Sequence, residues 1–199
     1  MLSGFNPAPL TAYRIKDYIM ATKAKTKAGR AAERNSSRSQ SSNRNTQGAS
    51  PSALEVLEQD HREVEEWFDD YNELKEDDNR KGALAEKICL ALKVHAQIEE
   101  EIFYPQARQA TKDNDLIDEA AVEHATVKHL IGAIEGMEVD EELHGAKIRV
   151  LGEMVKHHIK EEEEELFPEL VPTKMDLDAV GKELAKRKER ADRGNASLK

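Results

Sequence analysis

Apolar side chains recur every three or four positions through the middle of the chain, which is the spacing of one face of an α-helix. The first such stripe begins behind Ser52 and Glu55, a pair spaced as in a capping box. The members of this stripe are Leu54, Leu57, His61, Val64, Phe68 and Tyr71. No segment shows the two-residue alternation that is typical of a half-buried β-strand. The pattern therefore predicts an all-α fold.

Three further stripes follow the first. A polar break at residues 77–79 precedes the second stripe, which contains Leu84, Ile88, Ala91, His95, Ile98 and Ile102 and is expected to end near Pro105. Asp113 is the expected cap of the third, which contains Ile117, Ala120, His124, Val127, Ile131 and Ile134. Asp140 is the expected cap of the fourth, which contains Leu151, Met154, His158 and Leu166 and is expected to end before Pro168. Four long helices joined by short loops predict an up-down-up-down four-helix bundle over residues 51–172.

Charge divides the 199-residue chain into three parts. Only 38% of the residues are hydrophobic and 35% are charged, which is too polar for a fully packed globule of this length. Residues 1–50 hold nine Lys and Arg against two acids, whereas residues 51–173 hold 13 bases against 33 acids. We therefore expect a disordered, basic, Ser/Arg-rich arm over residues 1–50. Residues 173–199 form a charged tail that could be helical, without an apolar stripe strong enough to predict docking.

Composition also limits the compartment and the class of protein. No apolar run approaches the roughly 18 residues of a membrane span, so an integral membrane protein is excluded. The single cysteine, Cys89, excludes a disulfide framework and fits a reducing compartment, which predicts a cytoplasmic protein. The basic arm fits a solubilising tail best, while organellar targeting and nucleic-acid contact stay open as alternatives.

Each of the four stripes carries one histidine near its middle. These histidines are His61, His95, His124 and His158. One imidazole on an apolar stripe is commonly a core residue with an ordinary partner, but four would bring up to eight ring nitrogens into one core. A bound metal ion would accept their lone pairs. The pattern therefore indicates a metal site inside the bundle.

Glutamates and an internal repeat strengthen this interpretation. Glu99 and Glu162 each lie four residues after a stripe histidine, on the same helix face, and add carboxylate oxygens to the set. An offset of 63 residues relates the two halves of the bundle. It carries His61 to His124, His95 to His158, Glu99 to Glu162 and Pro105 to Pro168. A duplicated helix pair would hold two metals about a pseudo-twofold axis, with carboxylates able to bridge them.

These motifs resemble the hemerythrin HHE cation-binding domain over about residues 53–170. The resemblance is carried by Asp60-His61, by His95-x-x-x-Glu99 running into Phe103-Tyr104-Pro105, by Glu123-His124, and by His158-x-x-x-Glu162 running into Leu166-Phe167-Pro168. It implies a four-helix bundle with a non-haem di-iron centre that is carboxylate-bridged and oxo- or hydroxo-bridged. Members of that family bind oxygen, sense iron or oxygen, or respond to nitric oxide or peroxide.

The resemblance also implies a ligand set. One iron would take His61, His95 and Glu99, and the other His124, His158 and Glu162; zinc is a lesser alternative to iron. Lys128 stands where oxygen-carrying hemerythrins have a further histidine, and their last carboxylate would select Glu163. The internal repeat instead selects Glu162, which we prefer. The remaining histidines, His129, His144 and His157, are expected to lie outside the ligand set, the last two exposed.

The near-symmetric ligand set favours a redox-active sensor or iron binder over a dedicated oxygen carrier. The expected partner is a small diatomic ligand or peroxide. No membrane contact is expected, and nucleic acid is not the expected partner, although residues 1–50 leave it open as an alternative. Apart from the metal ligands the sequence shows no pair of nucleophile and base, so we predict no catalytic residues and at most a weak redox activity toward peroxide or nitric oxide. The alternative function is a metal-independent helical interaction module whose basic arms contact an acidic partner or nucleic acid.

Overall fold

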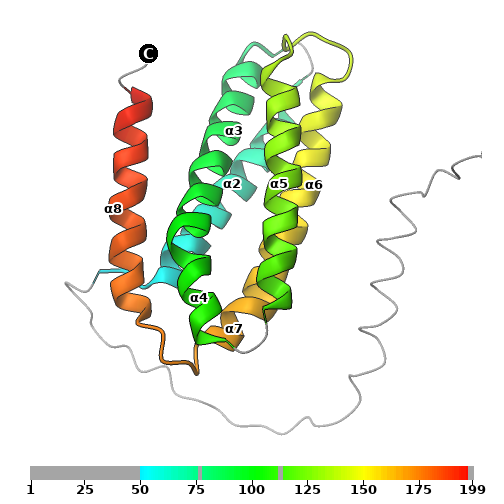
Figure 1. Cartoon of the computed structure of the whole chain (residues 1–199). Helices are drawn as coiled ribbons and strands as arrows, with labels where there is room; N and C mark the ends of the chain where they lie inside the picture. Colours follow the sequence, from blue (N-terminus) through cyan, green and yellow to red (C-terminus); the bar gives the residue numbers. More distant parts are fainter. Residues whose placement is uncertain (1–49, 76–77, 112–113, 197–199) are drawn as a thin grey trace, which may run out of the picture. The chain divides into compact units, whose positions relative to one another are not determined.

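The computed structural model describes residues 50–75, 78–111 and 114–196, and these residues form helices without any β-strand. The all-α prediction is confirmed. The four longest stripes correspond to α2 (Ala53–Glu73), α3 (Arg80–Ile98), α5 (Asp115–Glu135) and α6 (His144–Glu161). Helix α2 packs against α3 and α6, and α5 packs against the same two helices (Figure 1). The predicted basic arm, up to residue 49, lies outside the described residues.

Helix starts agree with the sequence only in part. The capping box of α2 is confirmed, because the Ser52 side chain accepts the N–H of Glu55 and the Glu55 carboxylate accepts the N–H of Ser52. The expected cap Asp113 lies outside the described residues. The prediction for Asp140 is wrong, since α6 begins only at His144. Glu141 interacts with the backbone there instead: its carboxylate accepts the N–H of Glu138 and its carbonyl accepts the N–H of His144.

The second and fourth helices continue past the prolines that were expected to end them. A π-helical turn, η2 (Glu99–Phe103), joins α3 to α4 (Tyr104–Ala110), and η3 (Glu162–Leu166) joins α6 to α7 (Phe167–Leu170). In each turn the backbone bonds reach back five residues, from Tyr104 to Glu99 and from Phe167 to Glu162. Pro105 and Pro168 then stand at the start of a new α-helical segment, where a missing N–H breaks no hydrogen bond.

The buried apolar side chains form two clusters with a polar layer between them. Along α2, Leu57 belongs to the first cluster and Val64 to the second, with the buried His61 between them. Along α6 and η3, Val155 belongs to the second cluster and Leu166 to the first, with the buried His158 between them. The two clusters therefore enclose a layer of buried histidines and glutamates halfway along the helices.

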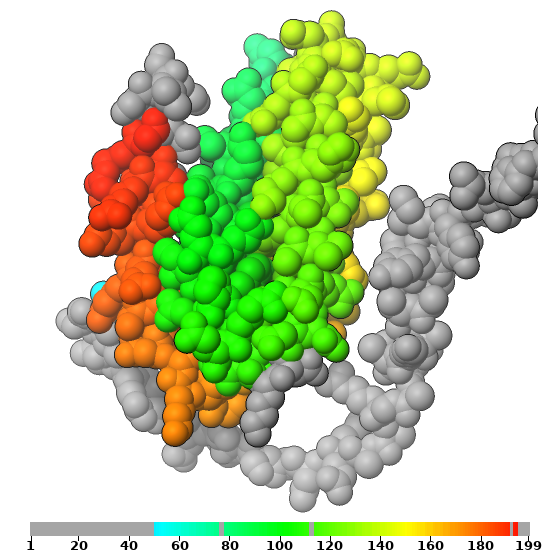
Figure 2. Space-filling view, viewed as in Figure 1, coloured from blue at the N-terminus to red at the C-terminus, as the bar shows by residue number. Residues whose placement is uncertain are grey.

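An additional helix, α8 (Leu177–Ala196), packs against α2, α3 and η2 (Figure 2). Val180 and Leu184 are its fully buried side chains and belong to the first apolar cluster. Gly181 lies against the start of α2, where a Cβ atom would be 2.6 Å from the backbone carbon of Ser52. Two apolar positions in a charged segment are too few to predict such packing from the sequence. Among the described residues, no helix is long and apolar enough to cross a membrane.

Candidate metal centre

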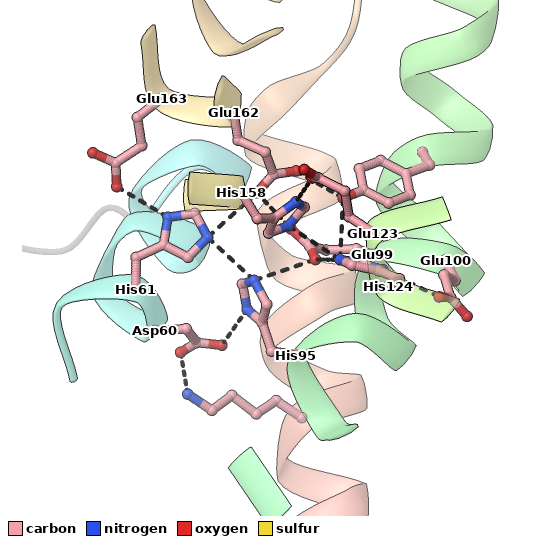
Figure 3. Close-up of polar contacts among 12 residues, drawn as sticks. Asp60, His61, His95, Glu99, Glu100, Glu123, His124, His158, Glu162 and Glu163 are labelled. Atoms are coloured by element: carbon pink, nitrogen blue, oxygen red, sulfur yellow. Dashed lines mark hydrogen bonds and ion pairs between the residues drawn. The ribbon is translucent and has the colours of Figure 1, made fainter. Parts of the chain in front are cut away.

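Four imidazoles meet in the polar layer as two pairs, each pair from two different helices (Figure 3). The Nε2 atoms of His61 on α2 and His95 on α3 are 3.1 Å apart. The Nε2 atoms of His124 on α5 and His158 on α6 are also 3.1 Å apart. Two neighbouring ligands of one metal ion have about this separation. Each pair therefore has the geometry of two nitrogen ligands for a single ion.

The outer nitrogen of every imidazole contacts a carboxylate. His61 Nδ1 is 2.9 Å from Glu163, and His158 Nδ1 is 2.8 Å from Glu123. His124 Nδ1 is 3.1 Å from Glu100, and His95 Nδ1 is 3.4 Å from Asp60. A carboxylate can only accept, so each Nδ1 carries the proton and each Nε2 presents its lone pair to the interior. This is the orientation that a metal-binding histidine requires.

Two glutamates span the two imidazole pairs. Glu99 Oε2 is 3.2 Å from His95 Nε2 and 3.3 Å from His124 Nε2. Glu162 Oε2 is 3.4 Å from His61 Nε2 and 3.5 Å from His158 Nε2. Both carboxylates are fully enclosed, and both oxygens of Glu99 and the Oε2 of Glu162 accept no hydrogen bond. Orphaned buried carboxylate oxygens beside imidazole lone pairs suit a divalent cation, which would satisfy both kinds of donor atom.

The glutamates come from the π-helical turns, and each turn clamps one imidazole on a facing helix. Glu99 and the next residue, Glu100, contact the two ring nitrogens of His124. Glu162 and Glu163 contact the two ring nitrogens of His61 in the same way. Two consecutive side chains of an α-helix diverge by about 100°. In the wider π turn, two consecutive glutamate side chains instead contact the same imidazole ring.

The pKa values of the two inner carboxyl groups are shifted in opposite directions, although both groups are buried. Burial and the charge of Glu162 raise the pKa of Glu99 well above its usual value. Burial also acts to raise the pKa of Glu162, but His158 and His61 outweigh it and lower that pKa. Burial lowers the pKa of His95 to about 4, because Asp60 compensates only in part. Metal binding therefore competes with protonation of Glu99.

Cations hold three of the four outer carboxylates in place. Lys128 Nζ is 2.7 Å from Glu100, and Arg62 is 3.2 Å from Glu163. Lys188 of α8 pairs with Asp60. The fourth outer carboxylate, Glu123, has the half-exposed His157 at 3.7 Å. Lys128 thus contacts Glu100, the carboxylate partner of His124 Nδ1.

One pair of residues breaks the symmetry of the centre. The Tyr104 hydroxyl donates to Glu162 Oε1 over 2.8 Å and lies 3.5 Å from His124 Nε2. The 63-residue offset places Phe167 at the equivalent position of the other half. Phe167 has no hydroxyl and stacks on His61, with ring centroids 6.1 Å apart. Glu162 therefore receives a hydrogen bond that Glu99 lacks.

The structure brings together all six residues that the sequence nominated as ligands. Two buried groups have candidate ligand atoms within 4.8 Å of one another: His61, His95, Glu99 and Glu162 form one, and Glu99, His124 and His158 the other. A third group of this kind, Glu123, His157 and Glu161, is partly exposed and contains none of the inner glutamates. Glu162 faces this interior, whereas Glu163 lies on the outer side of His61. His129 and His157 are exposed. The prediction of an exposed His144 is wrong, because its side chain is buried, away from the centre, at the start of α6.

The sequence interpretation missed the outer carboxylates. The same 63-residue offset that relates the histidines also relates Asp60 to Glu123 and Glu100 to Glu163. These four residues are the partners of the Nδ1 atoms. The repeat therefore contained information that could have identified these four carboxylates. It did not predict the π-helical turns that direct Glu100 and Glu163 toward the imidazoles.

Comparisons with known proteins agree with this geometry. The family model described as the hemerythrin HHE cation-binding domain matches residues 52–170. A similar solved structure is that of a hemerythrin HHE cation-binding domain-containing protein from Mycobacterium kansasii, with 26% sequence identity and a TM-score of 0.63. The match covers 74% of this chain and 91% of that one. No curated protein matches. The chain belongs to the hemerythrin HHE cation-binding domain family.

Proposed function

We propose that this protein holds a non-haem di-iron centre in an up-down-up-down four-helix bundle. One iron would take His61 and His95, and the other His124 and His158. Glu99 and Glu162 would bridge the two irons, because each glutamate contacts one imidazole in each of the two pairs. The resemblance implied a carboxylate-bridged centre with Glu99 listed for one iron and Glu162 for the other, and the observed contacts favour bridging by both glutamates.

The observation that carries this proposal is the pair of enclosed carboxylates with unpartnered oxygens between the imidazole pairs. Leaving a buried polar atom without a hydrogen-bond partner costs about 1–3 kcal/mol of folding free energy, and more when the group is charged. Imidazole nitrogens and carboxylate oxygens together form a donor set that suits iron. A metal-independent interaction module would leave these orphaned oxygens unexplained. Zinc would also satisfy them, and its lack of colour and redox chemistry distinguishes it.

Iron would supply one-electron redox chemistry and free coordination positions for a small ligand. The protein's own residues orient the donors and keep water out. The outer carboxylates fix each imidazole in the tautomer that presents Nε2, and the two apolar clusters close the centre from both sides. Tyr104 holds Glu162 in place through the hydroxyl hydrogen bond. A centre enclosed in this way favours reaction with a small uncharged molecule.

The proposed role is binding or sensing of dioxygen, nitric oxide, peroxide or iron. Two histidines on each side give similar surroundings to both metal positions, whereas an oxygen carrier gains from one saturated and one open iron. Lys128 supports this interpretation, because it pairs with Glu100 instead of adding a nitrogen ligand. We therefore favour a redox-active sensor over an oxygen carrier.

Rapid mixing of the reduced, iron-loaded protein with dioxygen, nitric oxide and hydrogen peroxide tests this role. We expect a lasting change in the absorption spectrum with at least one of the three, because the centre is oxidised or retains the ligand. The zinc-loaded protein is the matched control and should give no change. A stable dioxygen complex that forms and is removed reversibly by evacuation would contradict the sensor interpretation and indicate a carrier.

A further inference from the structure

A cavity of about 250 Å³ lies beside His61 and His95. It runs between α2 and α3, reaches Val155 and Ile159 on α6, and is partly open to solvent, with the exposed Lys87 in its lining. The cavity therefore borders the polar layer next to one imidazole pair. A diatomic gas or hydrogen peroxide would occupy only a small part of this volume, since one water accounts for about 30 Å³ in the liquid.

The walls of the cavity are mainly apolar. On α2 the lining stripe is Asp60, Val64 and Trp67, and on α3 the facing stripe is Lys87, Ala91 and His95. Each stripe follows the three- and four-residue spacing of one helix face. The apolar part of the lining, which includes Val64, Trp67 and Leu90, would contact the body of an organic guest.

The charged groups at the rim already have partners. Lys87 lies over the Trp67 ring, 3.7 Å from its centroid, and Lys188 pairs with Asp60. Glu63 accepts a hydrogen bond of 3.0 Å from Gln59. A charged guest would have to compete with these contacts, whereas a neutral guest would leave them intact. The lining therefore selects for an uncharged molecule.

The internal repeat changes the walls of this cavity in the second half of the bundle. The 63-residue offset carries Ala91 to the longer Met154, whereas it carries Trp67 to the smaller Leu130. Met154 is partly buried and packs against the second apolar cluster, so a long side chain stands where the first half has only a methyl group. Lys188 has no counterpart in the repeat, because α8 follows it in the chain.

We infer that this cavity binds a neutral organic molecule with an alkyl or aryl body, whose single polar group faces His61 and His95. The inference deepens the proposed function and rests on it, since it names the class of ligand that would approach one metal position. The two metal positions would then differ in their access to this ligand, although their protein ligands are alike. The cavity would select the ligand by its size and its lack of charge.

Trp67 offers a direct test, because it is the sole tryptophan of the sequence and lines the cavity. We would titrate the protein as purified with 4-bromobenzyl alcohol, whose bromine quenches indole emission, and record Trp67 fluorescence together with iron content. We expect saturable quenching with a dissociation constant on the order of a millimolar or tighter. Ala91→Met, which copies the second half, should weaken binding at least tenfold. Met154→Leu is the matched control and should bind as the wild type does.

Circular dichroism and thermal melting establish that each variant is folded, and Ala91→Leu replaces Ala91→Met if the latter is not. Linear, unsaturable quenching that Ala91→Met leaves unchanged would overturn the inference. Unsaturable quenching in a protein that does take up iron would refute the cavity alone. Saturable, Ala91-dependent quenching in a protein that takes up no iron would uphold the cavity and refute the proposed di-iron function.

Discussion

At the scale of single residues, the run Glu161–Glu165 shows how neighbouring identical side chains take different roles. Glu162 is enclosed between His61 and His158, whereas Glu163 is partly exposed and contacts the outer nitrogen of His61. Glu164 is exposed and pairs only with Lys160. The position of each side chain on the π turn, and not its chemistry, decides which one reaches the interior.

We predict a graded effect on iron affinity along this run. Glu162→Gln should abolish uptake of at least one iron, because it removes a carboxylate that both imidazole pairs contact. Glu163→Gln should weaken iron binding about 10- to 100-fold, as is typical for the partner of a metal-binding histidine. Glu164→Gln is the matched control and should bind iron as the wild type does. Competition with a chelator measures all three, and equal affinities would refute the predicted ligand set.

His95 makes a pH-dependent contribution to the stability of the metal-free protein. Its pKa is lowered by burial from 6.5 to about 4 in the folded state. Between these values the unfolded chain binds a proton that folded His95 does not, so the free energy of unfolding falls as the pH decreases from about 6.5 to 4. Burial acts to lower the pKa values of His61 and His158, but the nearby Glu162 has the larger effect and raises both. These two histidines therefore stabilise the folded protein below about pH 6.5, and this stabilisation is lost as the pH rises through their folded-state pKa values.

Substitution of His95 should therefore change the pH profile. In urea unfolding of the metal-free protein, the free energy of unfolding should fall less for His95→Gln than for the wild type as the pH decreases from 6.5 to 4. The exposed His129 provides the control, since His129→Gln should follow the wild-type profile. Parallel profiles for His95→Gln and the wild type would show that His95 titrates normally in the folded state.

At the scale of the elements, the sequence predicted the histidine-bearing helices well and their ends poorly. The apolar stripes of α2, α5 and α6 each follow one buried face. Helix α3 also packs against α8 and buries residues around much of its circumference, including Cys89 and Val94, which the predicted stripe did not contain. Pro105 and Pro168 suggested helix ends, yet both stand just after a π turn, at the start of a new α-helical segment. At that position the missing proline N–H removes no backbone hydrogen bond. A π turn is specified by contacts between distant segments, such as Glu100 with His124, and these leave no local pattern in the sequence.

Helix α8 depends on a close contact that only glycine permits. A Cβ atom on Gly181 would lie 2.6 Å from Ser52 C and 2.8 Å from Ala53 N, at the start of α2. Gly181→Ala should therefore destabilise the protein by about 1–3 kcal/mol through overpacking. Gly194 lies on the same helix, and a Cβ atom added there would meet nothing within 4 Å, so Gly194→Ala should instead stabilise by about 0.5–1 kcal/mol. Urea unfolding measures both, and equal effects would contradict the docking of α8 on α2.

At the scale of the whole molecule, the internal repeat gives a centre with two similar halves and different surroundings. The repeat allowed all six inner residues to be nominated from the sequence, because a metal centre needs its donors at fixed helical spacings. The differences between the halves could not be predicted in the same way. They arise from single substitutions, such as Tyr104 against Phe167 and Ala91 against Met154, and from the docking of α8.

The central claim is that the polar layer holds two irons in each chain. The most direct measurement is the metal content of the protein purified from a native-like host, together with absorption spectra in air and after reduction. We predict two irons per chain and a near-ultraviolet absorption band that bleaches on reduction. Zinc in the site, or a folded protein with no metal and no such band, would contradict the claim and leave the histidines and glutamates as a buried polar network.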